Sequence, residues 1–213
     1  MEHTARDEKR KRLAELRQEV AGLEQELGEK PAHWQADRYY AAYHATNGFI
    51  LGIIGAAASL LFNVVGSLVV GQAPLKLIQV YLTFPLGEKA LSPDFDSGIA
   101  LAIGCCLYLA TGMVLGVPFQ MIMARLLPRS STLSQRLLLA TVLGLLLWGI
   151  NFYGILAWLQ PFLFDGHNWI TDPKLLPPWV GAATHLVFAW TMALVFPWGQ
   201  YVPYRRQTES PAE

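Results

Sequence analysis

Two histidines near the end of the chain are the residues best suited to bind a metal or a haem iron. His167 lies in a polar connection, and His185 follows in the last apolar segment. Imidazole nitrogens are common ligands of zinc, copper and haem iron, and Asp165 and Asp172 place carboxylates close by in the sequence. A haem- or metal-binding redox protein is therefore one candidate function, with His167 and His185 as its candidate cofactor ligands.

The alternative for these histidines is structural. A histidine at a membrane interface more often hydrogen-bonds a neighbouring residue than ligates a metal, so no metal site and no cofactor are predicted. Cys105 and Cys106 are adjacent, and neighbours on a helix point about 100° apart, which excludes a disulfide between them. Because the sequence also has no nucleophile elbow, phosphate-binding glycine loop or zinc spacing, no catalytic residues are predicted. The residues favour a protein that is not an enzyme.

The elements that must position these residues are apolar helices. Four long stretches contain no Asp, Glu, Lys or Arg, and about 20 apolar residues suffice for a helix to cross a bilayer. The sequence thus predicts an all-α polytopic membrane protein, a bundle of four transmembrane helices preceded by a cytoplasmic N-terminal helix. The predicted spans are 49–71, 99–121, 138–160 and 180–203.

Basic residues predict how the chain threads the bilayer. Of the 16 Lys and Arg residues, only Lys76, Lys89 and Lys174 fall in the two connections that follow the first and third spans. By the positive-inside rule both termini are cytoplasmic, and we expect a multi-pass protein of the inner, cytoplasmic membrane. The predicted divisions are a cytoplasmic segment (1–42), a transmembrane domain (43–204) and a cytoplasmic tail (205–213). The lipid bilayer is an expected partner, and nucleic acid is not.

Small residues follow one face of the first span at spacings of three and four. Such spacing lets two helix backbones approach closely, which is how helices associate inside a membrane. The sequence leaves open whether the partner helix belongs to this chain or to another subunit. Gly112 and Gly116 repeat the spacing in the second span, and Asn151 in the third is suited to an interhelical hydrogen bond. The face in the first span consists of Gly48, Gly52, Gly55, Ser59, Asn63 and Gly66.

The N-terminal segment carries a short heptad pattern. Its apolar residues recur every three or four positions among charged ones, and they are Leu13, Leu16, Val20, Leu23 and Leu27. A helix this short is marginal in water without a partner. Either it forms a coiled coil with another subunit or a second copy, or it lies on the cytoplasmic face of its own chain.

A further apolar segment, 74–84, lies between the first two spans. Lys76, Gln79 and Thr83 fall on one helical face and apolar residues on the others, so we predict a short helix in the outer interface. It would lie in lipid or be covered by a partner.

The leading functional hypothesis is a non-catalytic integral membrane subunit or scaffold of a larger complex, a respiratory or other electron-transfer assembly being one class. Its partners would be other membrane subunits or further copies of the chain. Proton-moving proteins usually keep charged residues within their spans, and this chain has none there. The alternative is a small channel or facilitator in which Pro118 kinks the second span and polar residues line a path. Those residues would be Asn63, Thr111, Gln120 and Asn151.

Overall fold

A computed structural model describes residues 2–26, 40–92, 95, 98–128 and 130–200. The chain divides into two compact units, Met1–Asp37 and Arg38–Glu213. The described part of the first unit is one helix, α1 (Glu2–Glu26). On it, Leu13, Leu16, Val20 and Leu23 are all exposed, whereas Leu27 lies outside the described residues.

The second unit is an all-α bundle, as predicted, and the described residues contain no strand. Four helices are long and apolar enough to cross a membrane, so the chain is a multi-pass membrane protein. The first crossing helix begins at Ala41, eight residues before the predicted span. The crossing helices are α2 (Ala41–Val69), α4 (Gly98–Leu126), α5 (Leu133–Gly149) continued by η2 (Ile150–Leu156) and α6 (Ala157–Leu163), and α7 (Pro178–Val195) continued by η3 (Phe196–Gly199).

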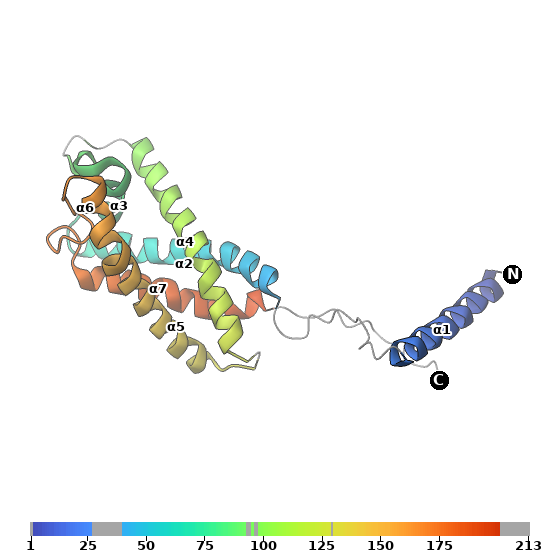
Figure 1. Cartoon of the computed structure of the whole chain (residues 1–213). Helices are drawn as coiled ribbons and strands as arrows, with labels where there is room; N and C mark the ends of the chain where they lie inside the picture. Colours follow the sequence, from blue (N-terminus) through green and yellow to red (C-terminus); the bar gives the residue numbers. More distant parts are fainter. Residues whose placement is uncertain (1, 27–39, 93–94, 96–97, 129, 201–213) are drawn as a thin grey trace. The chain divides into compact units, whose positions relative to one another are not determined.

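Helices α2 and α7 pack against each other, and the other two crossing helices pack on them. Helix α4 lies along α2, and α5 lies along α7. Figure 1 shows α4 and α5 diverging from the short connection that joins them, and they make few contacts with each other. Helix α5 begins at a capping box, in which Thr132 and Gln135 each bind the other's backbone N–H, so its first turn is well defined.

The end of the bundle at which α2 begins and α7 ends, here called the terminal end, is densely packed. Leu51, Phe119, Met123 and Met192 are among the buried members of its core, and the rings of Phe119 and Phe188 meet edge to face with centroids 5.9 Å apart. This core connects α2, α4, α5 and α7, and it fills the bundle from its centre to the terminal end.

The opposite end is filled by α3 (Lys76–Leu86) and η1 (Gly87–Leu91). The predicted short helix is present, but its predicted place in lipid or under a partner is wrong. Ile78, Val80 and Leu82 are almost completely buried within the chain's own bundle. A Cβ atom at Gly104 would lie 2.6 Å from Ile78 Cγ2. The missing side chain of Gly104 therefore makes room for α3 against α4, and the sequence pattern of α3 alone could not show this.

Candidate functional site

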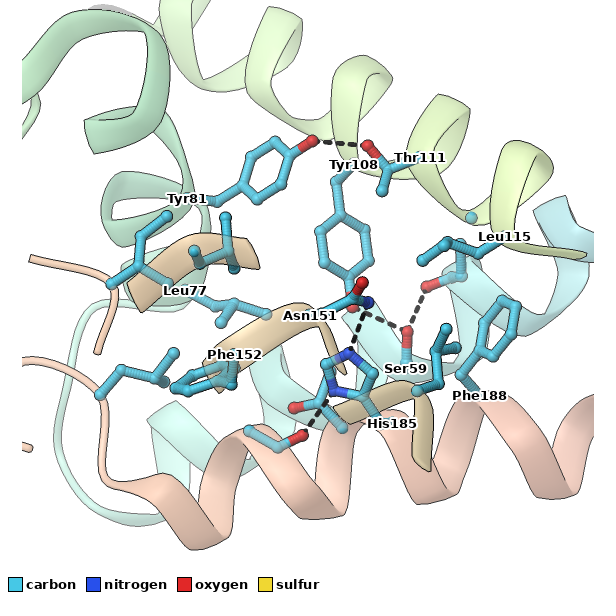
Figure 2. A pocket seen from close by; sticks show the side chains of 18 of the residues that line it. Ser59, Leu77, Tyr81, Tyr108, Thr111, Leu115, Asn151, Phe152, His185 and Phe188 are labelled. Atoms are coloured by element: carbon cyan, nitrogen blue, oxygen red, sulfur yellow. Dashed lines mark hydrogen bonds between the residues drawn. The ribbon is translucent and has the colours of Figure 1, made fainter. Parts of the chain in front are cut away.

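A cavity of about 260 Å³ lies between α3 and the four crossing helices. It sits on the α3 side of the terminal core, with Phe188 contributing to both. Figure 2 shows the side chains around it, which come from α2, α3, α4, α5, η2 and α7 and from the connection before α7. Most of the lining is apolar or aromatic, none of the lining residues carries a formal charge, and the polar ones are Ser59, Tyr81, Tyr108, Thr111, Asn151, Thr184 and His185.

Ser59 and Tyr108 connect α2 to α4 across one wall of the cavity. Their hydroxyl oxygens are 2.8 Å apart, and Ser59 also donates to the carbonyl of Ala56 at 2.9 Å. Because a carbonyl oxygen only accepts and a serine has one hydroxyl proton, Tyr108 must be the donor to Ser59 Oγ. The oxygen of Tyr108 keeps lone pairs that can accept a hydrogen bond.

Tyr81 and Thr111 form a second hydroxyl pair, between α3 and α4. Their oxygens are 2.6 Å apart, and Thr111 donates to the carbonyl of Leu107 at 3.0 Å. By the same reasoning Tyr81 donates to Thr111. The rings of Tyr81 and Tyr108 pack edge to face with centroids 5.7 Å apart. The two tyrosines therefore form an aromatic wall whose hydroxyl protons are already used.

His185 and Asn151 form the third polar group, between α7 and η2. His185 Nδ1 lies 2.8 Å from the carbonyl of Gly181, so Nδ1 carries a proton. In the neutral ring Nε2 is then an acceptor, and it receives an N–H of Asn151 at 3.3 Å. This bond uses one N–H of Asn151, and the other N–H and the carbonyl oxygen have no partner among the described residues.

The backbone around Asn151 is itself unusual. Ile150–Leu156 is a π-helical segment inside the third crossing helix. Such insertions shift the faces of a helix locally and are frequent at functional sites. Here the segment places Asn151 on the cavity and buries Phe152 beside it. Predictions from sequence periodicity assume a regular helix. The sequence therefore showed that Asn151 is polar, but not which residues surround it.

The predicted small-residue face packs mainly within the chain. A Cβ atom at Gly48 would lie 2.4 Å from the carbonyl oxygen of Gly116, and one at Gly52 would lie 2.3 Å from that of Gly112. Gly55 faces the ring of Phe188 on α7. The partner helices left open by the sequence are therefore α4 and α7 of the same chain.

The remaining members of that face behave differently from one another. Ser59 lines the cavity, and Asn63 Nδ2 donates to Thr184 Oγ1 at 2.9 Å, joining α2 to α7. Gly66 is exposed, and nothing lies within 4 Å of the position that a Cβ atom would take there. Asn63 is thus the last residue of this face that contacts another helix.

The two candidate cofactor ligands have different surroundings. His167 is exposed and stacks on Trp169, with ring centroids 5.4 Å apart, whereas both nitrogens of His185 are used by Gly181 and Asn151. Asp172 accepts a hydrogen bond from the backbone N–H of Lys174. Among the described residues, no group of three or more His, Cys, Asp or Glu side chains is placed to hold a metal ion.

The four residues of the hypothetical channel do not share one path. Thr111 and Asn151 line the cavity, but Asn63 is bonded to Thr184. Gln120 is fully buried, with its Nε2 3.4 Å from the carbonyl of Gly199 at the terminal end. The densely packed terminal core lies between the cavity and that end.

Gln160 is among the buried polar residues that sequence reasoning missed. Gln160 is completely buried; its Oε1 accepts from the backbone N–H groups of Trp169 and Ile170 at 2.8 and 3.0 Å. Its Nε2 donates to Thr83 at 3.1 Å. Gln160 therefore ties the connection before α7 to both α6 and α3. The only sequence signal for this role was the position of Gln160 at the end of a predicted span. That position is equally typical of a glutamine at the membrane interface.

Comparisons with protein-family models, curated proteins and solved structures find no match to this chain.

Proposed function

We propose that the chain is a non-catalytic integral membrane subunit or scaffold of a larger membrane assembly. The observation that carries this proposal is the exposed apolar stripe of α1, formed by Leu13, Leu16, Val20 and Leu23. Exposed leucines at heptad spacing favour association with another helix. In the proposed arrangement α1 lies on the cytoplasmic side of the inner membrane, as do both termini, and it pairs with another subunit or with a second copy.

The bundle supports the same proposal in two ways. Its closest backbone contacts, at Gly48 and Gly52, are made within the chain, so the membrane domain can fold as one unit. Its buried polar side chains are largely engaged in holding helices together, as in the pair Asn63 and Thr184. Electron-transfer complexes are one class of assembly that such a subunit would serve.

The proposal is tested by changing only the stripe of α1. Full-length protein carrying Leu16→Lys and Leu23→Lys is purified in mild detergent beside the wild type and a Gln18→Lys control. Gln18 is exposed and lies off the heptad positions. We expect the wild type and the control to be recovered with a stoichiometric partner or as a defined oligomer, and the double variant to be recovered without it, as measured by native mass spectrometry.

If the double variant keeps the same partner or oligomer as the control, α1 does not mediate assembly. If wild type is recovered only as a monomeric chain under conditions that keep known membrane complexes intact, the subunit role itself is contradicted.

A further inference from the structure

We propose that the cavity between α3 and the crossing helices binds a neutral, lipid-soluble molecule with an oxygen-bearing ring, of the quinone or quinol class. The inference goes beyond the proposed subunit role and does not depend on it. It rests on the volume of the cavity, the chemistry of its lining and the hydrogen-bonding capacity left unused at Asn151.

The volume fits a ring rather than a whole lipid. An apolar cavity of about 150 Å³ holds benzene, so about 260 Å³ accommodates a substituted ring together with the first part of a tail. It is too small for a phospholipid with two chains. The aromatic side chains of Tyr81, Tyr108, Phe152 and Phe188 line it, and aromatic rings pack favourably in offset or edge-to-face arrangements.

The lining excludes a charged ligand. None of the lining residues is Asp, Glu, Lys or Arg, and in its neutral form His185 has both ring nitrogens hydrogen-bonded, to Gly181 and to Asn151. Bringing an ion into such a site without a counter-charge is strongly unfavourable. The ligand is therefore neutral.

The free polar groups indicate where oxygen atoms of the ligand would bind. Asn151 retains one N–H and its carbonyl oxygen, and the oxygen of Tyr108 can accept one more bond. A ring carbonyl can accept from the Asn151 N–H, and a ring hydroxyl can donate to Asn151 Oδ1 or to Tyr108. A plain acyl chain would leave these groups without partners at membrane depth, which costs free energy.

The surroundings of the cavity indicate how such a molecule enters. Thr111 lines the cavity and is also exposed on the helix surface. The neighbouring exposed side chains on α4 are apolar, among them Leu107 and Val114. In a membrane this surface faces hydrocarbon, so a lipid-soluble molecule can enter sideways from the bilayer while its tail stays in lipid.

The test uses the full-length protein in lipid nanodiscs, titrated with a benzoquinone that has a short saturated tail. Binding is followed by quenching of tryptophan fluorescence, with empty nanodiscs correcting for partition into lipid. Asn151→Leu removes the free amide, and Leu147→Phe fills the cavity. Their matched controls are Asn47→Leu, which removes an amide near the terminal end, and Leu143→Phe, one helical turn from Leu147 and outside the lining.

We expect saturable binding to wild type, weakened about tenfold or more by Asn151→Leu and by Leu147→Phe and changed less than about twofold by the controls. Thermal unfolding without ligand identifies any variant that fails to fold. If one of the two cavity variants, Asn151→Leu or Leu147→Phe, fails to fold, quinone binding by the other one tests the proposal. An alkylbenzene of the same tail length, lacking the ring oxygens, should bind about tenfold more weakly than the quinone. No saturable binding to wild type overturns the proposal, as does equal binding of the alkylbenzene or equal binding by cavity variants and controls.

Discussion

The closest approach in the bundle, between α2 and α4, gives the sharpest prediction about stability. A Cβ atom added at Gly52 would lie 2.3 Å from the carbonyl oxygen of Gly112 and 2.9 Å from the Cα of Met113. Both neighbours are backbone atoms and cannot turn away as a side chain can. The two helices would have to separate by about 1 Å to restore ordinary contact distances. We therefore expect Gly52→Ala to destabilise the bundle.

The magnitude follows from a comparison with Gly66→Ala. Replacing glycine by alanine within a helix stabilises the helix by about 0.5–1 kcal/mol, and this gain is shared by both variants. Only Gly52→Ala adds the cost of overpacking, which is about 1–3 kcal/mol, because nothing lies within 4 Å of the position that a Cβ atom would take at Gly66. The ratio of folded to unfolded protein should differ between the two variants by about 5- to 150-fold.

Reversible unfolding in mixed micelles, followed by circular dichroism, measures this difference. Gly116→Ala should behave like Gly52→Ala, since its Cβ atom would lie 2.2 Å from the carbonyl oxygen of Gly48. If Gly52→Ala and Gly66→Ala unfold at the same denaturant concentration, α2 and α4 do not meet at these glycines and the reasoning fails.

Two further predictions concern buried hydrogen bonds. Gln160→Leu should raise hydrogen exchange at the amides of Trp169 and Ile170, because both lose their acceptor. It should destabilise the fold by about 1–3 kcal/mol for the backbone N–H groups left unpaired, and unchanged exchange would contradict the role given to Gln160. Thr83→Val is its control for exchange: it removes only the acceptor of Gln160 Nε2, so it should leave exchange at the Trp169 and Ile170 amides unchanged. A double-mutant cycle of Asn63→Leu and Thr184→Val in the same unfolding assay should give a coupling free energy of about 0.6–2 kcal/mol. Additive effects of the two substitutions would mean that the pair does not hold α2 to α7.

The class of fold could be predicted from the sequence because the bilayer imposes it. Long stretches without charge have few options other than spanning helices. The spacing of Gly48 and Gly52 suggested close helix packing on that face, and α4 lies against both glycines. What could not be predicted was which helix would fill the space opposite. Gly112 and Gly116 had the matching pattern, but such patterns are common in membrane helices.

The cavity could not be predicted because it depends on features that leave no periodic signal. The π-helical segment at Ile150–Leu156 changes the direction of Asn151 without an unusual residue to mark it. Tyr81 and Tyr108 are aromatic residues of a kind common in membrane proteins, and only the return of α3 into the bundle brings their rings together. The short helix α3 was itself predicted. The burial of its apolar residues, however, depends on Gly104, which lies far from α3 in the sequence.

The central claim is that the chain crosses the membrane four times, so that the connections at the two ends of the bundle face opposite compartments. The direct measurement is labelling of single cysteines with a membrane-impermeant reagent, after Cys105 and Cys106 have been replaced by alanine. Ser92→Cys and Ser130→Cys are suitable because both residues are exposed, one after α3 and the other between α4 and α5. We expect Ser92→Cys to react only from outside intact cells and Ser130→Cys only after the membrane is opened. Reaction of both cysteines from the same side would contradict the four crossings.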